Sequence, residues 1–283
     1  MQSVLKMELK KAFTNKLFLC ALCLAAAIAV YSAVFCIHAY HTFGQMDMNS
    51  AQITGYELNP ELPGTSLFTQ WIGKEFISPA SSLFYLLMPL LAALGYGWSY
   101  CNERKSGYIK SIVTRTSRQN YFLSKYIAVF LSGGAVITIP ILLNIMLVAA
   151  FVPAIQPDVF YDVYYGAHPW STLTPLFYAH PFGYMLLKTT ATFVFAGLIA
   201  TLSLTVTFFN KNVFVVTLTP LFFLLLINYI SNSLSNAPEI SPIQFLHSGK
   251  VYVSLSVVLC EAVLLFVVSF AVTVLRGKKN DIF

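Results

Sequence analysis

Charged residues are scarce in this chain of 283 residues, at 10% of the sequence against the roughly 25% that is usual for soluble domains. Hydrophobic residues make up 57% of it. So few charges cannot give a domain of this size a hydrated surface, so the composition excludes a soluble globular protein. It indicates a protein that lies within a lipid bilayer.

The sequence also lacks the motifs of a nucleotide hydrolase and of an intramembrane enzyme. Gly73-Lys74 has no glycine five positions before Gly73, as a phosphate-binding loop requires. H-E-x-x-H and G-x-S-x-G are absent, and no histidine falls in the middle of a long apolar run. The run Leu131-Ser132-Gly133-Gly134 imitates part of an ATPase signature, but it lies inside an apolar run, so we interpret it as a helix-packing patch of small residues. We therefore expect no catalytic residues in this chain.

Cysteine and histidine do not form a recognisable metal site or disulfide framework. The five cysteines fall in or beside apolar runs, and Cys20-x-x-Cys23 has no second pair, so we interpret it as packing by small residues. His38 and His41 are spaced for one helical face, but no cluster of further ligands adjoins them. We expect no metal and no cofactor on this chain.

Six apolar runs are long enough to cross a bilayer core of about 30 Å as helices that rise 1.5 Å per residue. They cover residues 17–37, 77–100, 127–151, 183–209, 213–230 and 251–275. Pro79 and Pro89 interrupt the second run and Pro140 the third, which predicts kinked helices and not broken spans. The predicted fold class is all-α and integral to the membrane.

Basic residues give the orientation of these spans. On one side of them fall 14 of the 17 Lys and Arg residues, namely Lys6, Lys10, Lys11, Lys16, Arg104, Lys105, Lys110, Arg115, Arg118, Lys125, Lys211, Arg276, Lys278 and Lys279. The other side, which includes long loops over 38–76 and 152–182, carries Lys74 and Lys250 with most of the acidic residues, Glu75 and Glu239 among them. The positive-inside rule makes the basic side cytoplasmic, and six spans then place both termini there. The net charge of +6 is a topology signal, and we expect no nucleic acid as a partner.

Residues 1–16 have the pattern of an amphipathic helix. Its apolar face is predicted to carry Leu5, Leu9, Ala12 and Phe13. This pattern predicts a helix that lies in the membrane interface. The alternative is a basic flank that only fixes the topology.

A second amphipathic pattern lies between the second and third spans, in residues 102–126. Tyr108, Ile109, Ile112 and Val113 form an apolar stripe on a short helix. An apolar face in the cytosol must cover something. It covers either the ends of the protein's own helices or a groove on a partner.

The second span runs directly into Glu103-Arg104-x-x-Gly107, and the short apolar helix is followed by Ser117-Arg118 and by Lys125. This layout resembles the permease subunits of ATP-binding-cassette (ABC) transporters of the type-2 export class, although the family often has Thr where this chain has Tyr108. The resemblance implies that residues 1–16 are an elbow helix and that residues 106–120 are a cytoplasmic coupling helix. It also implies the residues that couple to the ATPase: Glu103, Arg104, Gly107, Tyr108, Ile109, Ile112, Val113 and Arg118.

The resemblance further implies a single permease domain over residues 1–283, paired with a second copy or a homologue. A separate ATPase subunit would bind ATP and Mg²⁺, and the cargo would be hydrophobic or amphipathic: a peptide, a drug or a lipid-like molecule. By analogy with small bacterial permeases, we expect a bacterial plasma membrane and a role in peptide-antibiotic export or resistance. The alternatives are an ion- or proton-coupled secondary transporter that uses Glu261 and, less favoured, an intramembrane enzyme.

Glu261 is the acidic residue inside a predicted span, about 15 Å into a core of about 30 Å. An ionisable group at this depth is by default a functional-site hypothesis. Three interpretations stay open. Glu261 forms an ion pair with Lys188 of the fourth span, contacts cargo or a coupled proton, or is protonated among polar neighbours such as Ser254, Asn144 or Asn228.

Overall fold

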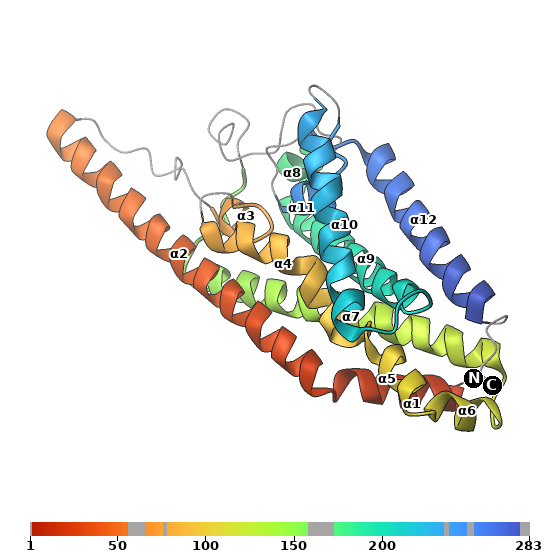
Figure 1. The fold of residues 1–283 in the computed structure, drawn as a ribbon. Coiled ribbons are helices and arrows are strands. Elements are labelled where there is room, and N and C mark those ends of the chain that lie inside the picture. The colour runs from red at the N-terminus through yellow and green to blue at the C-terminus, as the bar shows by residue number, and fades with distance from the viewer. Residues whose placement is uncertain are drawn as a thin grey trace.

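The computed structural model describes residues 2–55, 66–75, 78–157, 173–234, 238–247 and 252–277, and these residues form helices and no strand. Six helical segments are long and apolar enough to cross a membrane. The predicted fold class is therefore confirmed (Figure 1).

The six long segments correspond to the six predicted spans. They are α2 (Lys16–Thr54), α4 with α5 (Pro79–Tyr96 and Ser99–Lys105), α7 (Arg118–Ala149), α9 (Pro181–Val206), α10 (Val213–Ser233) and α12 (Leu255–Ala271), which continues into the π-helical turn η1 (Val272–Arg276). The shorter helices are α1 (Gln2–Phe13), α3 (Leu67–Gln70), α6 (Tyr108–Val113), α8 (Thr174–Ala179) and α11 (Pro242–His247).

Polar caps set where several of these helices begin. Ser78, Ser117 and Asn212 each accept a hydrogen bond from a backbone amide two or three residues further on, so they cap α4, α7 and α10. Pro79 is the first residue of α4, where a missing amide hydrogen has no cost. Contrary to the prediction, it therefore does not interrupt the span. Pro140 does lie inside α7.

The predicted loop over residues 38–76 is wrong in two respects. First, α2 continues past the end of its apolar run to Thr54, because a loss of apolarity marks the exit from hydrocarbon and does not by itself end a helix. Gly55 follows with a left-handed φ of 72°, a conformation typical of a helix end. Second, residues 66–75 fold back into the protein, and all four residues of α3 are buried. The far end of α2 extends away from the other helices (Figure 1).

Small residues allow α7 and α9 to pack closely at the centre of the molecule. A Cβ atom added to Gly133 would lie 2.3 Å from the Cβ of Ala200 and 3.3 Å from the carbonyl oxygen of Ala196. Ser132 and Gly134 beside it are also buried. This confirms that the Leu131–Gly134 run is a helix-packing patch.

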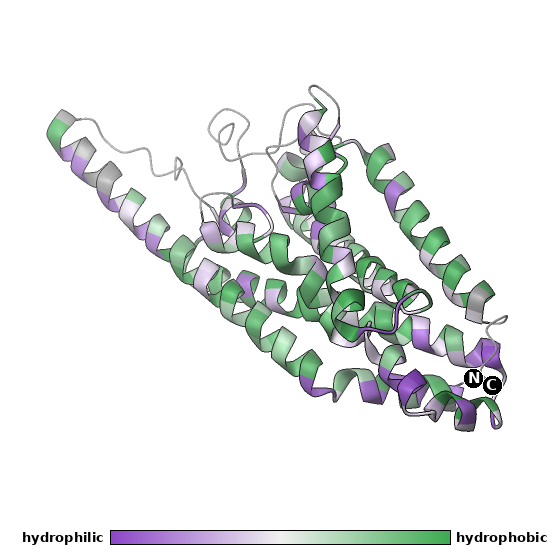
Figure 2. Cartoon of the chain, in the orientation of Figure 1, coloured by the Kyte–Doolittle hydropathy of each residue, from purple (hydrophilic) through white to green (hydrophobic). Residues whose placement is uncertain are grey.

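The helices α10 and α12 lie at the periphery. In the most apolar stretches of α10 and α12, only 22% and 17% of the residues are buried, against 67% in those of α4 and α9. Figure 2 shows hydrophobic residues along much of both helices, and large side chains such as Phe222, Leu226 and Leu259 are exposed. Such surfaces are stable in contact with lipid or with another protein.

The helices α1 and α6 and the turn η1 lie at the same end of the molecule (Figure 1). All three contact α7, and a Cβ atom on Gly277 would touch the ring of Phe122 in the first turns of α7. The first and last described residues therefore share one end, as an even number of spans requires.

Candidate functional site

The short helix α6 is separated from α5 by a left-handed glycine. Gly107 has a φ of 70°, and no atom lies within 4 Å of the position that a Cβ would occupy there. Glycine is therefore favoured by its backbone conformation and not by lack of space. The helix has six residues and is shorter than the predicted 106–120, because Ser117 already caps α7 and the residues between form a turn.

The apolar stripe of α6 faces the protein itself. Ile109 and Ile112 are buried, and Tyr108 and Val113 are half-buried against the core. Of the two predicted roles for this stripe, covering the protein's own helices is the one confirmed. The outward side carries the exposed residues Lys110, Ser111, Thr114 and Arg115.

A buried ion network lies beneath this segment. The Nζ atom of Lys125, on α7, is 3.0 Å from Oε2 of Glu8 on α1 and 2.8 Å from Oε2 of Glu103 on α5. Lys11 of α1 bridges the same two carboxylates, at 3.3 Å from Glu8 and 3.5 Å from Glu103. The side chains of Lys125 and Glu8 are fully buried, and that of Glu103 is 13% exposed. Two carboxylates and two ammonium groups balance in charge, as a buried cluster requires.

Tyrosines complete the network. Tyr96 donates from its hydroxyl to Glu8 at 3.0 Å and accepts from Lys125 at 3.2 Å, and Tyr121 donates to Glu103. Lys11 lies 3.7 Å above the ring of Tyr108, the first residue of α6. Hence α1, α4, α5, α6 and α7 are all joined through one polar cluster, which we call the junction network.

In this network, the attraction between opposite charges and the hydrogen bonds shift the pKa values of Glu8 and Lys11 more than burial does. Burial alone would raise the pKa of Glu8, but the ammonium groups of Lys125 and Lys11 and the hydroxyl of Tyr96 lower it below its ordinary value of 4.5. Burial alone would lower the pKa of Lys11, but Tyr108 and the two carboxylates raise it. Both groups are therefore held in their charged forms.

The predicted coupling residues separate into inner and outer sets. Glu103 belongs to the junction network, whereas Arg104 is exposed on α5. Arg118 is half-buried as the first residue of α7. The segment therefore combines a buried core with an exposed basic surface.

The sequence did not identify Glu8 as part of this site. The predicted face of the first helix was Leu5, Leu9, Ala12 and Phe13, but the residues that the structure buries are Val4, Glu8 and Ala12. Phe13 is 38% exposed. The sequence did hold a signal for Glu8, because it is a single acidic residue among lysines and lies four residues after Val4 and four before Ala12.

A second buried polar cluster lies toward the opposite end, and it includes two residues predicted to be in an exterior loop. Lys74 and Glu75 are 2% and 3% exposed. The Nζ atom of Lys74 is 4.4 Å from the centre of the Phe177 ring. Glu75 accepts hydrogen bonds from the Ser32 hydroxyl at 3.4 Å and from the Ser78 amide at 2.8 Å. The prediction failed because residues 66–75 fold back between the helix ends.

Lys188 belongs to this second cluster and not to a pair with Glu261. Its Nζ atom donates to the carbonyl oxygen of His247 at 3.1 Å. The imidazole of His247 contacts the Ser81 hydroxyl at 3.0 Å and stacks on Tyr85, with 5.0 Å between ring centres. Burial and the charge of Lys188 lower the pKa of His247 from 6.5 to about 4.

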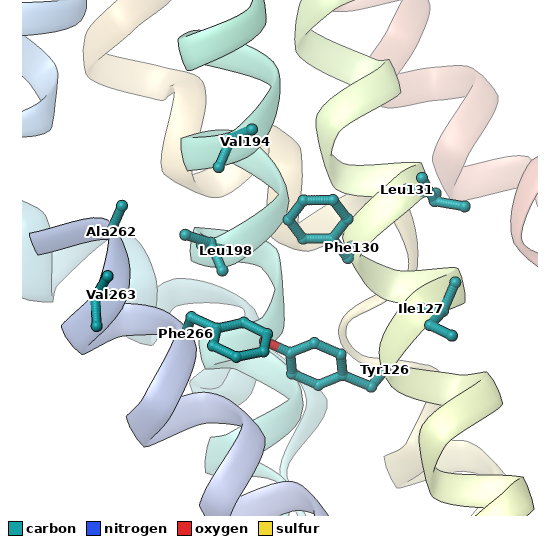
Figure 3. Close-up of a pocket in the computed structure, with 9 residues that line it drawn as sticks. All are labelled: Tyr126, Ile127, Phe130, Leu131, Val194, Leu198, Ala262, Val263 and Phe266. Carbon is teal, nitrogen blue, oxygen red and sulfur yellow. The ribbon is translucent and has the colours of Figure 1, made fainter. Parts of the chain in front are cut away.

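Of the three interpretations left open for Glu261, the ion pair with Lys188 is not found among the described residues, because Lys188 donates to His247 and Glu261 lies on another side of α12. The side that faces α7 and α9 carries Ala262, Val263 and Phe266, which border an apolar cavity of about 430 Å³ (Figure 3). Glu261 instead lines a cavity with residues of α10. Asn144, one of its suggested polar neighbours, accepts a hydrogen bond from the amide of Ile72 and donates one to the carbonyl oxygen of Ala29.

A family model of proteins of unknown function, DUF2705, matches residues 49–283. The chain belongs to the DUF2705 family. No curated protein and no solved structure matches it. The residues matched to DUF2705 include Tyr96, Glu103 and Lys125 of the junction network, whereas Glu8 and Lys11 precede them.

Proposed function

We propose that this chain is the membrane-spanning permease subunit of an ABC transporter, and that a separate ATPase subunit docks on α5 and α6. The observation that carries the proposal is the position of α6. Its apolar side is fixed to the protein above the junction network, and its outward side is exposed and basic. A short helix held rigidly at the surface suits the transmission of force from a partner, because its own apolar contacts do not have to break when the partner moves.

The junction network supports a mechanical role. A displacement of α6 acts on α5 through the Gly107 turn and on α1 through the contact of Lys11 with Tyr108. The carboxylate of Glu103 and the ammonium of Lys125 then link both to α7. With 32 residues, α7 is about 48 Å long at 1.5 Å per residue. It is therefore long enough to carry a movement from the docking end to the other end of the molecule.

The remaining parts of the proposal rest on the resemblance to these permeases. ATP and Mg²⁺ are bound by the partner ATPase, and this chain supplies no catalytic group. The docking end, with the excess of Lys and Arg, is cytoplasmic in a bacterial plasma membrane. A second copy or a homologue completes the pathway, and the cargo is hydrophobic or amphipathic, as in peptide-antibiotic export.

The test is recovery of the ATPase from native membranes. The tagged chain, solubilised from its own host, is expected to copurify with a nucleotide-binding subunit. The double charge reversal Arg104→Glu with Arg115→Glu is expected to reduce this recovery at least about tenfold, because two exposed basic contacts become repulsive. Lys211→Glu, at an exposed turn between α9 and α10, is the matched control and leaves recovery unchanged. If the wild-type chain recruits no such subunit, the proposal fails.

A secondary transporter is the second candidate, favoured by one observation. Both carboxylate oxygens of Glu261 are shielded from solvent, and they have no hydrogen-bond partner among the described residues. An intramembrane carboxylate of this kind can take up a coupled proton. Transport that continues in vesicles without ATP and stops when a proton gradient is collapsed would favour this candidate.

A further inference from the structure

Glu261 lines a cavity of about 470 Å³ between α10 and α12. The walls are largely apolar, with Phe223, Ile227 and Ile230 on α10 and Leu264 and Leu265 on α12. The volume lies within the range of about 300–1,000 Å³ that is usual for sites that bind small molecules. The cavity is open at the surface and thus combines apolar walls with a single ionisable group.

Among the described residues, no basic side chain lines this cavity. Glu239, next to the lining residue Ile240, adds a second carboxylate close to Glu261. The oxygen Oε1 of Glu239 is occupied by the Ser231 hydroxyl at 2.6 Å and the Ser241 amide at 3.0 Å. Lys188, the basic residue of the neighbouring span α9, donates a hydrogen bond to the carbonyl oxygen of His247. The cavity therefore favours a positively charged occupant.

The chemistry of the walls restricts what this occupant is. A metal cation such as Ca²⁺ requires six to eight oxygen ligands, and the cavity lining offers the carboxylate of Glu261 and the hydroxyl of Ser256. An organic cation needs a single opposite charge and apolar contacts for its body. The cavity provides both.

We propose that the cavity between α10 and α12 binds a hydrophobic monovalent cation, with its charge at Glu261 and its apolar body against Phe223 and Ile227. That this ligand is the transported cargo rests on the proposed function. The binding itself is a property of this chain and is measured without any partner.

The test uses radiolabelled tetraphenylphosphonium and the purified full chain in lipid nanodiscs. Saturable binding is expected for the wild type. Glu261→Gln keeps the shape of the side chain and removes its charge, so it is expected to weaken binding at least about tenfold, since an ion pair is strong in an apolar cavity. Leu259→Gln is the matched control, because it places the same amide on α12 at an exposed position outside the cavity, and it is expected to bind as the wild type does.

A second variant guards against failure of Glu261→Gln to assemble. Ile227→Trp keeps the carboxylate and fills the cavity from α10, so it is also expected to weaken binding. Uncharged tetraphenylmethane, of the same shape, is expected not to compete. Equal competition by the uncharged molecule, which would indicate an apolar lipid site, overturns the inference. So does unchanged binding in both variants, or the lack of saturable binding in a wild type that still recruits its ATPase. Saturable binding without ATPase recruitment overturns the proposed function alone.

Discussion

The junction network makes a quantitative prediction for Lys125→Met. Methionine keeps most of the length of the side chain but removes the ammonium group that contacts Glu8 at 3.0 Å, Glu103 at 2.8 Å and Tyr96 at 3.2 Å. Glu8 is then a buried carboxylate whose remaining counter-charge is Lys11, which lies 3.3 Å away and is 36% exposed. Breaking a buried ion pair from one side costs about 3–5 kcal/mol. Glu103 adds little to this cost, because it is partly exposed and keeps Lys11.

The double variant Glu8→Gln with Lys125→Met separates the ion pair from packing. Removal of both charges leaves no carboxylate at position 8 to be compensated. The double variant is therefore expected to lose about 2 kcal/mol less free energy of unfolding than the two single variants lose in sum. The control is Lys16→Met, which removes an exposed lysine at the start of α2 and changes the free energy of unfolding by less than about 0.5 kcal/mol.

The free energy of unfolding is measured in mixed micelles, by the loss of far-ultraviolet circular dichroism as the mole fraction of dodecyl sulfate rises. A loss below about 1 kcal/mol for Lys125→Met would refute the argument that the partly exposed Lys11 alone does not compensate the buried carboxylate of Glu8. Strict additivity in the double-mutant cycle would refute a direct interaction between Glu8 and Lys125.

Two further predictions concern a turn and a titration. Gly107→Ala places a side chain at a φ of 70° in open space, so it is expected to destabilise the local structure by about 1–2 kcal/mol and to raise hydrogen exchange in α6. Ser106→Ala is the control, because Ser106 has a right-handed backbone that accepts alanine without strain. Equal hydrogen exchange in both variants would contradict a conformational role for Gly107. The pKa of His247 falls from 6.5 to about 4 on folding, so the folded state disfavours the proton, and stability is complete above about pH 6.5 and decreases by about 3 kcal/mol as the pH falls to 4. Glu8, whose pKa is also lowered, removes further stability below about pH 4.5. Unfolding midpoints measured against pH for His247→Gln are expected to lose the decrease above pH 4.5, and a profile like that of the wild type would contradict the buried neutral imidazole.

Much of this architecture could be predicted from the sequence, because lipid selects for apolar side chains whatever their neighbours are. The six spans and the small-residue patch at Gly133 are of this kind. The inward stripe of Ile109 and Ile112 was also visible, since the period of a helix identifies a face. It does not identify what the face meets, so the choice between a partner and the protein's own helices needed the structure.

The polar contacts could not be predicted, because they join residues that are distant in the chain. Glu8 and Lys125 are 117 positions apart, and no periodic pattern links them. Lys74 and Glu75 have the composition of an exterior loop, but their segment folds back among helix ends. Local sequence records whether a residue is polar, whereas its partner is decided by how the helices are arranged.

The close packing of α7 against α9 has a consequence for permeability. At Gly133 and Ala200 the two backbones approach with no long side chain between them, so no rotamer change can open a gap there. Water and ions can pass this contact only if the two helices separate as whole bodies. The contact between α7 and α9 is thus closed by backbone and methyl groups that have no alternative position to adopt.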